Sequence, residues 1–376
     1  MISKTLLVGI QLCFLTMALG CSSSKTSQTT SDSASFADVD AAIDSTGSDA
    51  TPTADANGAA DSAETASSLP SYIDVADTAS IETADPQRVT VMTFNLMCSF
   101  CMNSTHLEWD QDWALRKPMI RDIFLRHSPD LIGIQELQEF VPYPPADLPD
   151  NPTMDQPLQI TAPEFAYDFE FYHHKAGDLL DSDYDDATVF WKKARFDKLE
   201  SGVFWLSPTP ELAFSTGFKQ PQEPRLVVWV LLHDKTTSKD FYFANTHYDN
   251  NAPSQALSAP LTLQQFAPLL AKHPLIFAGD FNANSKHVAY ATLTQGDKGQ
   301  GPSLQDSHNL AKQKAILTNV TPAPLTLDTL EDIDHIFLGG ATFDVTWWVT
   351  DTWRYTAKVE GPTDHNGPII TSVHWQ

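Results

Sequence analysis

The sequence is poor in basic residues and lacks a hydrophobic run long enough to cross a membrane. It has 23 Lys and Arg residues against 48 Asp and Glu residues, and the basic residues form no cluster. Proteins that hold nucleic acid mainly through its backbone charge usually present a basic surface, so the composition argues against that class without excluding it. The longest apolar run, residues 6–19, falls short of the roughly twenty residues that a membrane-spanning helix needs.

Cysteine is also scarce, with four residues in the chain. Cys98 and Cys101 form a C-x-x-C motif, but the thioredoxin-like strand and helix pattern expected around a redox motif is missing, as are further ligands at zinc-site spacing. We therefore interpret this pair as a short structural disulfide, which an oxidising compartment would preserve.

The N-terminus has the features of an export signal. Lys4 precedes the apolar run, whose length suits a signal peptide, and Ala18-Leu19-Gly20 lead directly into Cys21. This ending resembles a bacterial lipobox, which implies that Cys21 is acylated and that the chain is anchored in the cell envelope by its N-terminal lipid. The alternative is a plain signal peptide and a secreted product.

The composition changes completely after Cys21. Residues 22–86 are mostly Ser, Thr, Ala and Asp, and they include twelve Asp or Glu against one Lys. Such a segment cannot bury enough apolar surface to offset its chain entropy, so we expect a disordered acidic tether. We thus predict a signal peptide over residues 1–20, a tether over 21–87 and one large domain over 88–376.

Within the predicted domain, strand-like runs outnumber helices and no fixed repeat appears. Helical spacing occurs over residues 113–127 and 261–272, the second interrupted by Pro268, and a Pro-rich acidic passage at 140–164 predicts a long surface loop. This balance favours an α/β (α+β) fold with two packed sheets and helices outside. Strands are predicted at 88–96, 131–134, 187–191, 203–206, 226–233, 241–246, 275–278, 332–337, 343–349 and 368–373.

Polar residues recur at the ends of these predicted strands. Each alone is more typical of a turn or a surface position than of a site, but residues i and i+2 of a strand share a face, so such groups can converge at one sheet edge. The residues are Asn95, Glu136, Asn245, His247, Asp249, Asp280, Asn282, Asp334, Asp364 and His365.

Taken in order, these motifs resemble those of the endonuclease/exonuclease/phosphatase superfamily. The resemblance extends over nearly all of residues 88–376, and it implies a four-layer sandwich of two mixed β-sheets flanked by helices. It also implies an enzyme that hydrolyses phosphate esters. The matching motifs are TFNL at 93–96, IQE at 134–136, NTHYD at 245–249, GDFN at 279–282, IDHIF at 333–337 and TDH at 363–365, with Trp113 and Arg116 as further likenesses.

The resemblance also implies roles for these residues. Glu136 would be the main ligand of Mg²⁺, with Asn95 beside it and Asp364 near a second metal position; Mn²⁺ and Ca²⁺ are alternative ions. His365, oriented by Asp334, would be the general base for water. His247 would hold the phosphate or protonate the leaving group, Asp280 and Asn282 would position the nucleophile and phosphate, and Arg225 and Asp249 are expected to contact substrate. Asp185 stands where pancreatic-type deoxyribonucleases carry the acidic partner of the first histidine, with Asp183 and Asp186 as alternatives.

Three departures from the pattern bear on the substrate. His247 stands where relatives of the exonuclease III type carry Tyr, which disfavours abasic-site endonucleases. Residues 250–261 contain no Arg, whereas many secreted relatives have one there, so a phosphate contact is either missing or supplied elsewhere, for example by Arg225. His335 replaces a common aromatic residue, and we expect it to pack in the core.

The substrate class stays open between nucleic acid, a phospholipid head group such as that of sphingomyelin, and small sugar or inositol phosphates. A lipid phosphodiesterase is expected to expose aromatic side chains toward the membrane, and Trp347-Trp348 could supply them. Adjacent residues of a strand face opposite ways, however, so packing of at least one of the two in the core is favoured. A binding module that has lost catalysis is disfavoured because every expected site residue is present. We expect a monomer with no protein partner.

Overall fold

The computed structural model describes residues 85–97, 113–137, 166–170, 186–218, 224–321, 323, 325–330, 332–355 and 361–376. Several predictions fall outside these ranges. They are the signal peptide, the lipid site at Cys21, all of the acidic tether before residue 85, the Cys98–Cys101 disulfide, the loop over 140–164 and the assignment of Asp185.

The first sheet has seven strands in the order β10-β12-β13-β1-β2-β4-β3. It is mixed, because β1 runs parallel to β2 and antiparallel to β13. The strands are β1 (Val89–Asn95), β2 (Leu131–Gln135), β3 (Tyr167–Glu170), β4 (Thr188–Lys192), β10 (Gln313–Leu317), β12 (Phe343–Asp351) and β13 (Ile369–Trp375).

The second sheet has six strands in the order β5-β6-β7-β8-β11-β9. Here β7 is parallel to β8, and β11 returns antiparallel beside β8 so that Asp334 lies directly opposite Asp280. The strands are β5 (Phe196–Trp205), β6 (Leu226–Asp234), β7 (Lys239–His247), β8 (Leu275–Asp280), β9 (Gln305–Asp306) and β11 (Asp334–Gly339).

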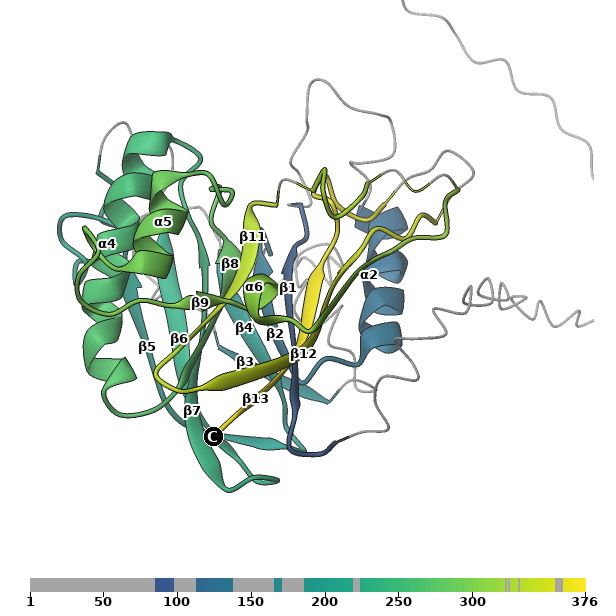
Figure 1. The fold of residues 1–376 in the computed structure, drawn as a ribbon, viewed down its shortest axis with the longest axis horizontal. Helices are drawn as coiled ribbons and strands as arrows, with labels where there is room; N and C mark the ends of the chain where they lie inside the picture. Colours follow the sequence, from purple (N-terminus) through teal and green to yellow (C-terminus); the bar gives the residue numbers. More distant parts are fainter. Residues whose placement is uncertain are drawn as a thin grey trace, which may run out of the picture. The chain divides into compact units, whose positions relative to one another are not determined.

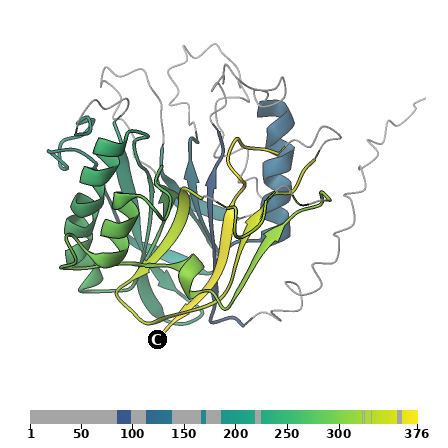
Figure 2. The same ribbon diagram turned by 45° about the horizontal axis from the view of Figure 1, so that its top comes forward.

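Helices cover the outer faces of both sheets (Figures 1 and 2). Helix α2 (Trp113–His127) lies on the first sheet, α4 (Ala252–Leu270) and α5 (Val288–Gln295) lie on the second, and the short α6 (Ser307–Leu310) follows β9. Three apolar clusters separate the layers: one between the sheets, one under α2 and one under α4 and α5. The predicted class, two packed mixed sheets flanked by helices, is confirmed.

The alternation of side chains along the strands decides which polar groups enter the space between the sheets. In β1, Val89 and Val91 belong to the core between the sheets, whereas Met92 and Phe94 pack toward α2. Asn95 follows Val91 at even spacing, so it faces inward at the end of the strand. The same parity in β8 sends Ile276 and Ala278 inward and therefore also Asp280.

Helix α4 begins earlier than the sequence predicts, at Ala252 rather than at residue 261. Asn251 caps it by accepting a hydrogen bond from the backbone of Ser254, which satisfies one of the free N–H groups of the first turn. Pro260 and Pro268 both lie inside the helix. None of the helices in the described ranges combines the length and the apolar character needed to cross a lipid bilayer.

The expected packing of the tryptophan pair and of His335 is confirmed. Trp348 is buried in the core between the sheets, while Trp347 is partly buried against the core under α2. His335 is buried as well, and its ring contacts Phe281 and Phe337.

Candidate active site

The centre of the site is the carboxylate of Asp280, at the inner end of β8. Its Oδ2 lies 3.3 Å from Nε2 of His247 and 3.5 Å from Nε2 of His365. The same oxygen accepts a hydrogen bond of 3.0 Å from the side-chain amide of Asn95. Two histidines, His247 from the end of β7 and His365 from the last motif, therefore converge on a single buried oxygen.

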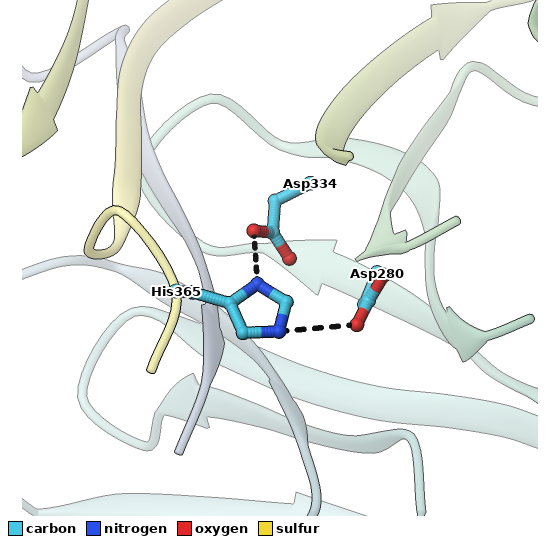
Figure 3. Close-up of side chains that lie close together, drawn as sticks. All are labelled: Asp280, Asp334 and His365. Carbon is cyan, nitrogen blue, oxygen red and sulfur yellow. Dashed lines mark hydrogen bonds and ion pairs between the residues drawn. The ribbon is translucent and has the colours of Figure 1, made fainter. Parts of the chain in front are cut away.

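A second carboxylate stands behind His365. Nδ1 of His365 is 2.6 Å from Oδ2 of Asp334, the first residue of β11 (Figure 3). Because Asp334 pairs with Asp280 across adjacent strands, the imidazole lies between the two carboxylates. An Asp behind a histidine fixes the tautomer of the ring and stabilises its charged form.

His247 has an equivalent partner in Asp186. The distance from Nδ1 of His247 to Asp186 is 2.9 Å, and Asp186 also forms an ion pair with Arg225. Asp186 is one of the two neighbours considered beside Asp185. Arg225 therefore pairs with the carboxylate that orients His247. The sequence predicted a contact with substrate for Arg225, whereas its contact in the structure is with Asp186.

The electrostatics of the two His–Asp pairs differ. Burial would lower the pKa of His365, but Asp334 and Asp280 outweigh it and raise this pKa well above its ordinary 6.5. Burial and Arg225 lower the pKa of His247, against Asp186 and Asp280, and the net direction is also upward. Burial would raise the pKa of Asp186, yet His247 and Arg225 bring it down to about 2. Arg225 therefore keeps Asp186 ionised and opposes protonation of His247.

Further acidic groups gather beside Asp280. The side-chain amide of Asn95 donates to Oε1 of Glu136 at 3.0 Å as well as to Asp280, so it bridges two carboxylates. The oxygen of the same amide accepts from the backbone of Met97. Desolvation raises the pKa of Asp364, and among its neighbours Glu136 raises it further while His365 lowers it. Glu136, Asp280 and Asp364 thus form one acidic neighbourhood.

The chain around these groups adopts unusual backbone angles. Glu136 and Asn282 have φ values of 58° and 48°, and Met97 and Ala187, which flank the site, have 54° and 83°. Side chains other than glycine rarely occupy this left-handed region, and such strain tends to occur at functional sites. Met97, Glu136 and Asn282 lie within two residues of the ends of β1, β2 and β8, and Ala187 directly follows Asp186. At these points the chain turns next to the polar groups of the site.

Two buried residues hold the loops of the site in place. The guanidinium of Arg116, on α2, donates to the carbonyls of Leu96, Met97 and Pro362. The hydroxyl of Thr363 donates to the carbonyl of Asn95 at 2.7 Å. The end of β1 and the loop that carries His365 are therefore tied to each other and to α2. The sequence offered Arg116 only as a motif likeness, because a helical Arg usually faces solvent.

Below the site, Asn245 ties the two sheets together. Its side-chain amide, on β7, donates to the carbonyls of Ile134 and Thr188 in the other sheet, and its oxygen accepts from Gln135 at 2.6 Å. Gly133 leaves room for this contact, since a Cβ there would come within 2.7 Å of the Asn245 oxygen.

Asp249 and Asn282 have local partners. Oδ1 of Asp249 accepts from the backbone and side chain of Asn251, so this carboxylate braces the start of α4 beyond the end of β7. The side-chain amide of Asn282 donates to the carbonyl of Tyr248, and its backbone N–H donates to Asp280. Asn282 therefore fixes the turn that presents Asp280.

The chain belongs to the Endonuclease/Exonuclease/phosphatase family, whose pattern matches residues 92–365. Members of this family hydrolyse phosphoester bonds. A curated relative, Carbon catabolite repressor protein 4 homolog 3 of Arabidopsis thaliana, is 25% identical over 224 residues, which cover 56% of this chain and 43% of that protein. The chain thus spans less than half of the length of this relative.

Solved structures share the fold. A mannosyl-6-phosphatase from Bacteroides thetaiotaomicron is 26% identical, with a TM-score of 0.58 and coverage of 77% of this chain and 99% of that chain. The catalytic domain of human Nocturnin, at 18% identity and a TM-score of 0.52 over 77% of this chain and 95% of that one, is similar in fold alone.

Proposed function

We propose that this chain is an extracytoplasmic, Mg²⁺-dependent hydrolase of phosphate esters. The observation that carries the proposal is the pair of His–Asp units that meet at Asp280: each histidine presents Nε2 to the same oxygen while its Nδ1 faces a carboxylate. General acid–base catalysis at a phosphoryl group relies on positioned proton donors and acceptors, and oriented imidazoles of this kind are the most common ones.

The residues beside this pair fit a hard divalent cation. Glu136 and Asp280 are held close by Asn95, and Asp364 adds a further carboxyl group, so the site is rich in oxygen ligands and in negative charge. Asp280, Asp334 and His365 also place ligand atoms within 4.8 Å of one another. His365 and Asp334 already contact each other at 2.6 Å through Nδ1 and Oδ2, so we assign the ion to Glu136, Asp364 and Asp280.

When bound, Mg²⁺ supplies positive charge that screens the phosphoryl oxygens and favours an ionised water. The residues of the chain do the rest. His365 accepts the proton of the attacking water at Nε2, and Asp334 stabilises the imidazolium that results. Asp280 and Asn282 hold the nucleophile. His247, kept charged by Asp186, binds a phosphoryl oxygen or protonates the leaving group.

The substrate is a phosphodiester or a phosphomonoester. Its class is best approached through a panel of plasmid DNA, RNA, sphingomyelin, phosphoinositides and sugar phosphates, each with Mg²⁺. The mannosyl-6-phosphatase likeness and the acidic composition support the sugar phosphates. We expect hydrolysis of at least one class that stops when EDTA is added. Failure on every class, with a folded protein, would overturn the proposal.

The extracytoplasmic location rests on the N-terminal pattern ending in Cys21. Lipid at this residue anchors the chain to the cell envelope, since several acyl chains on one cysteine hold firmly where a single chain does not. Expression of the full chain in a bacterial host tests this: the protein should fractionate with membranes, and Cys21→Ser should release it. Recovery of the unaltered chain in the cytosol would contradict the location.

A further inference from the structure

The segment after β12 presents an arginine beside the loop that carries His365. Asp351, the last residue of β12, donates its backbone N–H to the carbonyl of Pro368, just before β13. Three residues on, Nη1 of Arg354 lies so close to Gly361 that a Cβ there would come within 2.4 Å of it, and the carbonyl of Thr363 is 4.0 Å from the same point. Arg354 therefore lies against residues 361–363, which lead into Asp364 and His365.

The backbone of Arg354 is fixed in place. Its N–H donates to Oδ1 of Asn319 at 2.8 Å, and its carbonyl accepts from the side-chain amide of Asn319 at 2.7 Å. The side chain thus starts from a backbone that one amide holds from both sides. Preorganisation of this kind is expected where a side chain must meet a ligand at a set position.

Within the described part of the chain, the guanidinium of Arg354 forms no hydrogen bond or ion pair with another residue, and Asp351 acts on it only through its charge. Its Nε is buried without a hydrogen bond. The nearby carboxylate of Asp351 already accepts from Arg126 at 2.9 Å and from His127 at 2.7 Å. Five of the six other arginines form a hydrogen bond or ion pair with a described residue, namely Arg88, Arg116, Arg126, Arg195 and Arg225, and Arg121 also has an interaction.

An arginine that stays unpaired in this protein calls for a physical reason. Acidic residues outnumber basic ones by 48 to 23, so carboxylates are abundant. Burial lowers the pKa of Arg354, and the charge of Asp351 opposes this effect. A guanidinium nevertheless stays charged in a protein, so the buried Nε of Arg354 loses its hydration without gaining a protein acceptor. Buried donors of this kind are uncommon and are often completed by a ligand.

We propose that Arg354 forms an anion subsite that binds a second phosphate group of the substrate, next to the phosphate that is hydrolysed. This inference rests on the proposed function. A planar guanidinium suits phosphate oxygens because it can donate two parallel hydrogen bonds. It also supplies a phosphate contact that residues 250–261 do not offer and that Arg225, paired with Asp186, is not placed to give alone.

Binding measured without turnover tests the subsite. The full chain carrying His365→Ala serves as parent, and Arg354→Gln, Arg354→Lys and Lys298→Gln are added to it singly. Lys298→Gln is the matched control because it removes one positive charge from an exposed turn after α5. Titration calorimetry compares thymidine 5′-phosphate with thymidine 3′,5′-bisphosphate, and fructose 6-phosphate with fructose 1,6-bisphosphate.

The parent should bind the bisphosphate of at least one pair about 10- to 100-fold more tightly than the monophosphate, the range expected for one charge-assisted contact. Arg354→Gln should bring that ratio close to one, Arg354→Lys should keep part of it, and Lys298→Gln should keep all of it. The pair that responds tells nucleotide from sugar phosphate.

Two results overturn the subsite: a parent without preference in either pair, or a preference that survives Arg354→Gln. If Arg354→Gln weakens the binding of both ligands of a pair equally, the preference survives, and Arg354 would then be a structural support. Hydrolysis by the unaltered chain on the substrate panel is scored separately, so a preference lost in Arg354→Gln supports the subsite even if the proposed activity fails.

Discussion

Replacement of Asp334 by Asn tests the proposed division of labour at His365. The substitution keeps the shape of the side chain and removes the charge that accepts from Nδ1 at 2.6 Å. A hydrogen bond to a charged group contributes about 1.5–3 kcal/mol, which corresponds to about one to two pKa units. Because Asp334 raises the pKa of His365, Asp334→Asn should lower that pKa by about this amount.

The sign of the pH effect follows from the proposed role of His365 as a base. The pKa of His365 lies above 6.5, so the imidazole is protonated and inactive as a base at lower pH, and the rate should rise as pH increases through that pKa. In Asp334→Asn this acid limb should move to lower pH by about one to two units. The plateau should fall about 10²- to 10⁴-fold, because the ring loses its orientation.

The assay is the pH dependence of kcat/KM between pH 5 and 10, with the parent and the variant compared by circular dichroism to exclude unfolding. An acid limb that stays in place would refute the assignment of that limb to His365. A rate that falls as pH rises through the same range would instead assign His365 the role of proton donor.

Two further predictions concern stability. Asp186→Asn removes the ion-pair partner of buried Arg225 and one of the two carboxylates that face His247, and should cost about 3–5 kcal/mol of unfolding free energy. The pKa of Asp186 falls from 3.8 to about 2, so the contribution that the variant removes is full above pH 3.8 and is lost as pH falls through 2. The unfolding free energies of the parent and the variant should therefore converge in acid. Gly133→Ala should destabilise by about 1–3 kcal/mol, since the added methyl meets Asn245 and Ala278 at 2.7 and 2.8 Å. Denaturant titration measures both, and an unchanged midpoint in either variant would contradict the packing described for it.

Much of the fold was predictable from the sequence because strand periodicity is strong in the central strands. The bounds of α2 agree with the prediction, and the inward parity of Asn95 and Asp280 follows from alternation alone. The short edge strands β3, β9 and β10 were not predicted, because most of their residues are not buried and so carry little of the apolar pattern that marked the central strands. Helix α4 begins before the predicted start because the side chain of Asn251 caps it there. This cap is a hydrogen bond to the backbone of Ser254, and it forms only once the chain has adopted its local fold.

The site was predictable as a set of residue types and less so as a set of contacts. Several acidic residues adjoin Asp186, and only the fold decides that this one reaches both His247 and Arg225. The burial of Arg116 and the unpaired state of Arg354 depend on loops distant in sequence that meet at the same end of the first sheet. Spacing along the chain carries no signal for either.

The most direct test of the central claim is the rate of bis(p-nitrophenyl) phosphate hydrolysis with Mg²⁺ by the unaltered chain, by Glu136→Ala and by His365→Ala. We expect hydrolysis by the unaltered chain that EDTA abolishes and that added Mg²⁺ restores. Both variants should lose the activity while keeping the fold, because one removes the main proposed metal ligand and the other the proposed base. Unchanged rates in both variants would contradict the assignment of the site.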